Sequence, residues 1–261
     1  MVKRFIVFGL VALIHASGCA SMRAVPLDQS FWQEKGRRVG VALEEMPEAV
    51  VLINATDSFM GHGRSTIFPD EAQYTDHPMR LHETRTLRQA SRGVRGEGFN
   101  AVQDLLVQGL AERGFTAYKV GMPADTGTLK CFREGSGDGV YACSDYRDLG
   151  KSAGADYLII VRLEQYGTLC RYIDLNNYEV EVYAGVGAEM IEASTNRVLW
   201  RSCMSGGRFT KTVDAECSRP DHVPVILDGL EDLLEDAARS VSGQFFSSSP
   251  TPGNTSEPVH E

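Results

Sequence analysis

The alternation of apolar and polar residues predicts the central sheet of this protein. In YEVEVYAGVGAEMIEA, residues 178–193, apolar positions alternate with positions that are mostly polar or glycine. A period of two residues is typical of a strand with one buried face and one solvated face. A long apolar segment, 157–169, precedes this strand, and RVLWRSC follows it; the turn-forming clusters DLNN and STN separate the three segments. We therefore predict a three-stranded antiparallel meander over residues 157–203.

Helical spacing occurs at two places. One apolar stripe ends before Gly114 and comprises Phe99, Val102, Leu105, Leu106 and Leu110. A second stripe follows Pro224, a good first-turn residue, and comprises Leu227, Leu230, Leu234, Ala238, Val241 and Phe245. Short strands are expected at 37–43, 48–53 and 115–120. Together these elements predict an α/β fold with a mixed, largely antiparallel sheet, helices packed mainly on one face and a C-terminal amphipathic helix.

The remaining segments divide the chain. Residues 37–246 are expected to form a single domain. Within it, residues 54–98 show no sustained apolar period and are expected to form a long loop, with one short helix at 79–87. Residues 19–36 are unpatterned and predict a tether, and the Ser-, Pro- and Thr-rich residues 247–261 predict a disordered tail.

The N-terminal segment resembles the signal peptide of a bacterial lipoprotein. Lys3 and Arg4 precede ten uncharged, mostly apolar residues, too few to cross the roughly 30 Å hydrocarbon core of a membrane. Such a run fits a secretory signal peptide over residues 1–18. The sequence ASGC, 16–19, resembles a lipobox, which implies cleavage between Gly18 and Cys19 and attachment of acyl chains, palmitate among them, to Cys19.

The lipobox resemblance also implies a location. Ala20, rather than Asp, follows the cysteine, and by the sorting pattern of lipoproteins this implies the outer membrane, with the domain facing the periplasm. Two alternatives remain: simple cleavage that leaves a soluble secreted protein, or an uncleaved anchor.

Part of the domain resembles a superfamily of periplasmic lipoproteins, that of the curli-secretion lipoprotein and the penicillin-binding-protein activator lipoproteins. The resemblance is carried by GADYLIIVRLEQYG and VGAEMIEASTNRVLW, in which matching positions are Gly154, Ala155, Asp156, Thr195, Leu199 and Trp200. Asn196 stands where that turn often has Gly. The resemblance implies a non-enzymatic binding or accessory role in an envelope complex, for instance with a peptidoglycan synthase or a secretion complex.

Charge and motifs argue against several classes of function. The formal net charge is −9, and it becomes −11 when Lys3 and Arg4 leave with residues 1–18, so nucleic acid is not an expected partner. The sequence contains no G-x-S-x-G, P-loop or H-E-x-x-H motif. We therefore predict no enzymatic activity, no catalytic residues and no cofactor.

One alternative is a metal-dependent hydrolase. His62, His77 and His82, with carboxylates nearby, form the one constellation that would suit Zn²⁺. Their spacings of 15 and 5 residues within the expected loop favour solvated histidines instead, so no metal is expected.

Five arginines make the same region basic in an acidic protein: Arg80, Arg85, Arg88, Arg92 and Arg95. They are candidates for docking an acidic partner, a phosphate-bearing lipid or a glycan, because guanidinium groups grip such anions bidentately. The alternative is a solvated helix face.

Five cysteines remain besides Cys19, and in an exported protein they are disulfide candidates. The local pairs Cys131–Cys143 and Cys203–Cys217 are predicted, which leaves Cys170 unpaired; Cys170–Cys203 is an alternative. An unpaired Cys170 also raises a third hypothesis, a disulfide-linked structural homo-oligomer.

Overall fold

The computed structural model describes residues 24–55, 64–67, 78–123, 129–132, 139–174, 177–202, 209–217 and 219–247. The strands are β1 Arg38–Leu43, β2 Val50–Ala55, β3 Arg64–Ile67, β4 Thr116–Val120, β5 Tyr157–Asp174, β6 Asn177–Glu192, β7 Arg197–Arg201 and β8 Phe209–Val213. The helices are η1 Gln29–Gln33, α2 Pro78–Gly93, α3 Glu97–Glu112, α4 Arg147–Ala153, η4 Pro220–His222 and α5 Val223–Ser247. None of the helices in these ranges is both long enough and apolar enough to span a bilayer.

One eight-stranded mixed sheet is built around the long antiparallel hairpin β5–β6. On one side of the hairpin, β1 pairs in parallel with the first part of β5 and β2 with its later part. β4 extends the sheet beyond β1, and β3 extends it beyond β2. On the other side, β7 and β8 pair with opposite ends of β6. The predicted meander is confirmed as β5–β6–β7, and the predicted mixed α/β class is confirmed with it.

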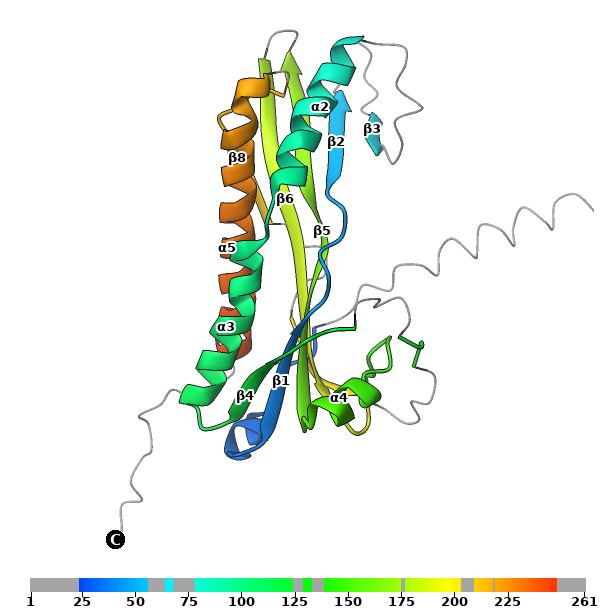
Figure 1. The fold of residues 1–261 in the computed structure, drawn as a ribbon, viewed down its shortest axis with the longest axis vertical. Coiled ribbons are helices and arrows are strands. Elements are labelled where there is room, and N and C mark those ends of the chain that lie inside the picture. The colour runs from blue at the N-terminus through cyan, green and yellow to red at the C-terminus, as the bar shows by residue number, and fades with distance from the viewer. Residues whose placement is uncertain are drawn as a thin grey trace, which may run out of the picture.

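The main core lies between the sheet and a layer formed by α2, α3 and α5 (Figure 1). The two predicted helical stripes pack there, and the second runs the length of α5. Close packing needs glycine at some crossings: a Cβ at Gly229 would lie 2.4 Å from Val213 Cγ1. Leu105 is the exception in the first stripe, since it is 38% exposed on the outer side of α3.

The second face of the sheet is more buried than the alternation predicts. α4 and the segments before it cover its lower part, where a smaller cluster includes Ala42, Leu158, Ile160 and Ile191 (Figure 1). On β6, Tyr183, Gly185, Gly187 and Glu189 were expected to face water and are buried instead. A polar or glycine residue is compatible with either environment, so the pattern alone does not report a covering layer.

The predicted tether, 19–36, is too long at its C-terminal end. Leu27, Phe31 and Trp32 are buried, and the Phe31 ring stacks on that of Phe115 with centroids 4.7 Å apart. Aromatic rings bury large apolar areas, so these side chains hold the segment in the core although it has no periodicity. The predicted long loop, 54–98, likewise contains β3 and the whole of α2.

Candidate functional site

The proposed lipidation site, Cys19, and the cleavage position, Gly18, lie outside the described residues. The described part of the chain begins at Ala24 and joins the sheet at the next residue. Val25 forms an antiparallel bridge with Arg201 on β7: the Arg201 N–H donates to the Val25 carbonyl at 2.9 Å, and the Val25 N–H donates back at 3.3 Å. The N-terminal segment therefore enters the fold at the outer edge of β7.

The candidate docking arginines lie on and just after α2. Arg85, Arg88, Arg92 and Arg95 follow one another at intervals of three, four and three residues, the spacing of one face of a helix. Arg85, Arg92 and Arg95 are exposed and Arg88 is half-buried. Arg80 is part of α2, but its side chain is outside the described set. Arg85, Arg88 and Arg92 thus share one face of α2, and Arg95 follows in the segment that leads to α3. We call these four residues the basic face.

The end of α2 is held against α5 by a carboxylate. The backbone N–H groups of Arg95 and Gly96 both donate to Glu231 Oε1, at 2.6 and 3.1 Å. This contact fixes how α2 passes into α3.

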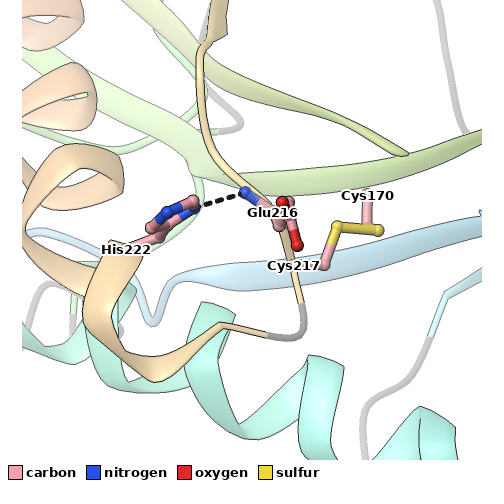
Figure 2. Close-up of a disulfide and its surroundings, with 4 residues drawn as sticks. All are labelled: Cys170, Glu216, Cys217 and His222. Atoms are coloured by element: carbon pink, nitrogen blue, oxygen red, sulfur yellow. Dashed lines mark hydrogen bonds between the residues drawn. A yellow bond between two sulfur atoms is a disulfide. The ribbon is translucent and has the colours of Figure 1, made fainter. Parts of the chain in front are cut away.

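The structure contains a disulfide that the sequence analysis did not predict. Cys170 on β5 is bonded to Cys217, which follows β8, with their Cα atoms 6.1 Å apart (Figure 2). Both cysteines are fully buried. The predicted pair Cys203–Cys217, the alternative Cys170–Cys203 and the unpaired Cys170 are therefore all wrong. The hypothesis of an oligomer linked through Cys170 is wrong for the same reason; Cys203 lies outside the described residues.

Sheet register explains this pairing. Val180 on β6 lies opposite Cys170 on β5 and also opposite Val213 at the end of β8, so the three form one row across the sheet. The turn after β8 then returns Cys217 toward that row. Nearby, His222 Nδ1 accepts a hydrogen bond from the Glu216 N–H at 2.8 Å (Figure 2). The imidazole thereby fixes the backbone next to the disulfide.

The predicted pair Cys131–Cys143 is also wrong, because both thiols are free and exposed. Cys131 lies opposite Ser144 in an isolated bridge, and the Phe132 N–H donates to the Cys143 carbonyl at 2.8 Å. The two cysteines are therefore offset by one residue rather than directly opposed.

The structure does not test the three histidines considered as metal ligands. His62 and His77 lie outside the described residues, and His82 is on α2 with its side chain outside them. Within the described part of the chain, no group of three or more His, Cys, Asp or Glu side chains is arranged to hold a metal ion.

The second face of the sheet carries a buried cluster of charged side chains that was not predicted from the sequence. Glu189 on β6 accepts hydrogen bonds from Arg162 on β5 and, at 2.9 Å, from Arg201 Nη2 on β7. At the margin of the cluster, Glu44 Oε1 lies 3.8 Å from Arg162 Nε and accepts a hydrogen bond from the Tyr146 hydroxyl at 2.9 Å. Two arginines and two carboxylates therefore balance one another where separate segments of the chain meet.

The environment shifts the titration of two members of this cluster. Burial raises the pKa of the Tyr146 hydroxyl, and the neighbouring Glu44 carboxylate raises it further. Burial is the largest single effect on the Arg162 guanidinium and would lower its pKa, but Glu189, Tyr146 and Glu44 together outweigh burial and raise it. At neutral pH Tyr146 therefore stays neutral and Arg162 stays charged, which keeps the hydrogen bonds of the cluster in place.

Asn196 anchors the turn between β6 and β7 to the segment before α4. It adopts a left-handed backbone with φ of 63° and is fully buried. Its side-chain oxygen accepts from the Tyr146 N–H at 3.0 Å, and its amide donates to the carbonyls of Ser144 at 2.9 Å and Ala142 at 3.3 Å. Glycine would permit the backbone conformation but would leave the segment before α4 without this anchor.

One shallow hollow lies between α3 and α5, with a volume of about 170 Å³. Its apolar lining includes Ala101, Leu105 and Ala238, and its charged lining includes Glu235 and Arg239. Arg239 is paired with Glu235 and with Asp236 at 3.0 Å, so its charge is balanced at the surface and one negative charge is left over.

Comparison with known proteins gives only distant likeness. No protein-family model matches the chain, and no curated protein does. A PelC dodecamer from Paraburkholderia phytofirmans is 15% identical, with a TM-score of 0.27, and the match covers 81% of this chain and 95% of that chain. The protein XCC0632 from Xanthomonas campestris is 9% identical, with a TM-score of 0.35, and the match covers 87% of this chain and 92% of that one.

A third similar structure is the lipoprotein GNA1162 from Neisseria meningitidis. It is 10% identical, with a TM-score of 0.26, and the match covers 77% of this chain and 99% of that chain. Likeness at this level assigns neither a family nor a function to the chain. The resemblance to the curli-secretion and penicillin-binding-protein activator lipoproteins stays a prediction.

Proposed function

We propose that this chain is an outer-membrane lipoprotein, anchored through Cys19, whose domain faces the periplasm and serves an envelope complex as a non-enzymatic binding module. The observation that supports this most is the position of Val25. The domain joins its sheet only six residues after Cys19. Six extended residues reach at most about 20 Å, so acyl chains on Cys19 hold the domain directly at the membrane surface.

The basic face of α2 supports the binding role. Arg85 and Arg92 are exposed on one helix face of a protein with a net charge of −9. A local positive surface on an acidic protein attracts an acidic partner and orients it toward that surface. We assign the partner-binding role to this face, which includes Arg85, Arg88, Arg92 and Arg95.

Metabolic labelling with palmitate tests the anchor. Wild-type protein should be labelled and should fractionate with membranes, whereas Cys19→Ala should lose both properties. Cys131→Ala is the matched control, because it removes an exposed free thiol elsewhere in the chain. Equal labelling of the wild-type and Cys19→Ala proteins would sink the proposal.

A further inference from the structure

The N-terminal segment emerges on the side of the sheet that carries α4. Val25 pairs with Arg201 at the edge of β7 and packs against the smaller apolar cluster beneath α4. Leu27 and Phe31, a few residues later, pack in the main core on the opposite face. The chain thus passes around the edge of the sheet just after Val25, and the helix layer lies on the far side.

A surface of aromatic and basic residues lies on this same side. The rings of Phe132 and Tyr141 stack with centroids 5.5 Å apart, and the Arg147 guanidinium lies over Phe132 at 5.1 Å from the ring centroid. Val140, beside Tyr141, is 42% exposed. We call this the anchor-side surface and define it by Lys130, Phe132, Val140, Tyr141, Arg147, Lys151 and Arg197.

The anchor-side surface is fixed to the sheet rather than carried on a free loop. Tyr141 forms an isolated bridge with Arg197 on β7, and the Val198 N–H donates to the Val140 carbonyl at 2.8 Å. The side chain of Asn196 fastens the residues that lead into α4. Binding a flat partner would therefore need little ordering of this surface, which lowers the entropic cost of contact.

The exposed charge of this surface is mainly positive. Lys130, Lys151 and Arg197 are exposed; among the described residues nearby, Asp148 is the exposed acidic side chain, and Glu192, opposite Arg197, is half-buried. Asp145 is paired with Arg147 at 2.7 Å, which lowers the pKa of that carboxyl and neutralises its charge locally. The surface is thus basic although the whole protein is acidic.

We infer that the anchor-side surface rests on the phospholipid headgroups of the membrane, with Val140 and the Phe132–Tyr141 pair at the interface and the basic side chains on anionic headgroups. Aromatic rings with Lys and Arg are the residues that favour the membrane interface. The inference rests on the proposed anchor at Cys19, which holds this side of the sheet within about 20 Å of the bilayer. The helix layer then faces away from the membrane.

Labelling of Cys131 tests this orientation, because that thiol is exposed within the surface. The lipidated full chain, with Cys143→Ser and Cys203→Ser, is reconstituted in vesicles of phosphatidylethanolamine and phosphatidylglycerol and treated with a charged maleimide. The control carries Gln89→Cys, at an exposed position of α2, with Cys131 also replaced by serine. The labelling rate at each cysteine is divided by the rate at the same cysteine in the unlipidated chain that begins at Ala20. Cys131 should react several-fold more slowly on vesicles, whereas the Gln89→Cys rate should not change.

Two outcomes would overturn the inference, and they differ from each other. Equal relative rates at both positions in protein with verified lipid on Cys19 would remove the inferred orientation and leave the anchor intact. A chain without lipid on Cys19 would remove the proposed function together with this inference.

Substitutions at two exposed valines distinguish direct contact of the anchor-side surface with the bilayer from mere proximity to it. Val140→Glu should restore rapid labelling of Cys131, whereas Val225→Glu, at an equally exposed position of α5, should leave it slow. Lys130→Glu should weaken the contact by about fivefold or more, as expected for loss of a basic residue at an anionic surface. Unchanged protection in both Val140→Glu and Lys130→Glu would contradict the inferred contact.

Discussion

Glu189 is the most deeply buried charged side chain among the described residues of the sheet. It is only 2% exposed, and its carboxylate is held by Arg162 and Arg201 from the two neighbouring strands. Arg201 lies directly opposite Glu189, and Arg162 is offset from it by two residues. A shift of either strand by one residue would leave a buried charge without its partner, so the cluster specifies the register of β5, β6 and β7.

Glu189→Gln should destabilise the protein by about 3 kcal/mol, because two largely buried guanidinium groups lose their counter-charge. Urea unfolding followed by circular dichroism measures the change in the free energy of unfolding. Glu192→Gln, on the same strand but less buried, is the control and should cost about 0.5 kcal/mol or less. Similar losses in the two variants would show that Glu189 has no special role in stability.

At the scale of elements, the disulfide joins the upper part of β5 to the segment that leads from β8 into α5. The bond spans a separation of 47 residues, which includes all of β6, β7 and β8. A cross-link over a loop of this size stabilises the fold by about 4 kcal/mol in the chain-entropy estimate.

Replacing both Cys170 and Cys217 by serine should therefore lower the free energy of unfolding by about 4 kcal/mol, measured by urea denaturation under oxidising conditions. Replacing both Cys131 and Cys143 by serine is the matched control, because those thiols are exposed and free. The control should change stability by about 0.5 kcal/mol or less. A larger loss in the control pair would contradict the assignment of the structural disulfide.

Local periodicity explains which elements could be predicted. The meander and the stripes of α3 and α5 depend on residues close in sequence, and all three elements form where the pattern places them, with Leu105 and Leu227 as the positions that are not fully buried. The disulfide depends on the row formed by Cys170, Val180 and Val213, which no local spacing reveals. Likewise, Glu189 fits the expected solvated face, and only the burial of the second sheet face shows that it is an internal charge.

The candidate sites also divide into those visible in the local sequence and those formed only by contacts between distant segments. The basic character of the region from Arg80 to Arg95 was visible in the sequence, and the structure places Arg85, Arg88 and Arg92 at helical spacing on α2, with Arg95 just beyond it. The anchor-side surface was not visible, because Phe132, Tyr141 and Arg197 come from separate segments that meet only through the sheet.

On the scale of the whole molecule, the two candidate contact regions lie on opposite faces of the sheet. α2 belongs to the helix layer, whereas α4 lies on the other side (Figure 1). Val25 packs against the cluster beneath α4. A protein anchored near Val25 therefore presents the α2 arginines away from the bilayer, where an envelope partner can reach them.

When the protein is cross-linked to its neighbours in intact cells and purified by affinity, the Arg92→Glu variant should recover about tenfold less of an acidic partner than the wild type. The substitution replaces an attractive charge contact by a repulsive one. Arg239→Glu is the control, an exposed arginine on α5 in the same helix layer. Quantitative immunoblotting of cross-linked species after affinity capture gives the comparison. If Arg239→Glu lowers capture as much as Arg92→Glu, net charge rather than the α2 face governs binding.

The long β5–β6 hairpin has different neighbours along its length. β1 and β7 pair with it at the end near Val25, whereas β2 and β8 pair with it at the other end. Most of the hydrogen bonds that hold the entry point of the chain are therefore independent of those at the hairpin tip. Residues inserted at the tip would extend the end of the sheet that carries β2 and β8 without disturbing the bridge at Val25, so the length of the hairpin sets how far the distal end lies from the entry point of the chain.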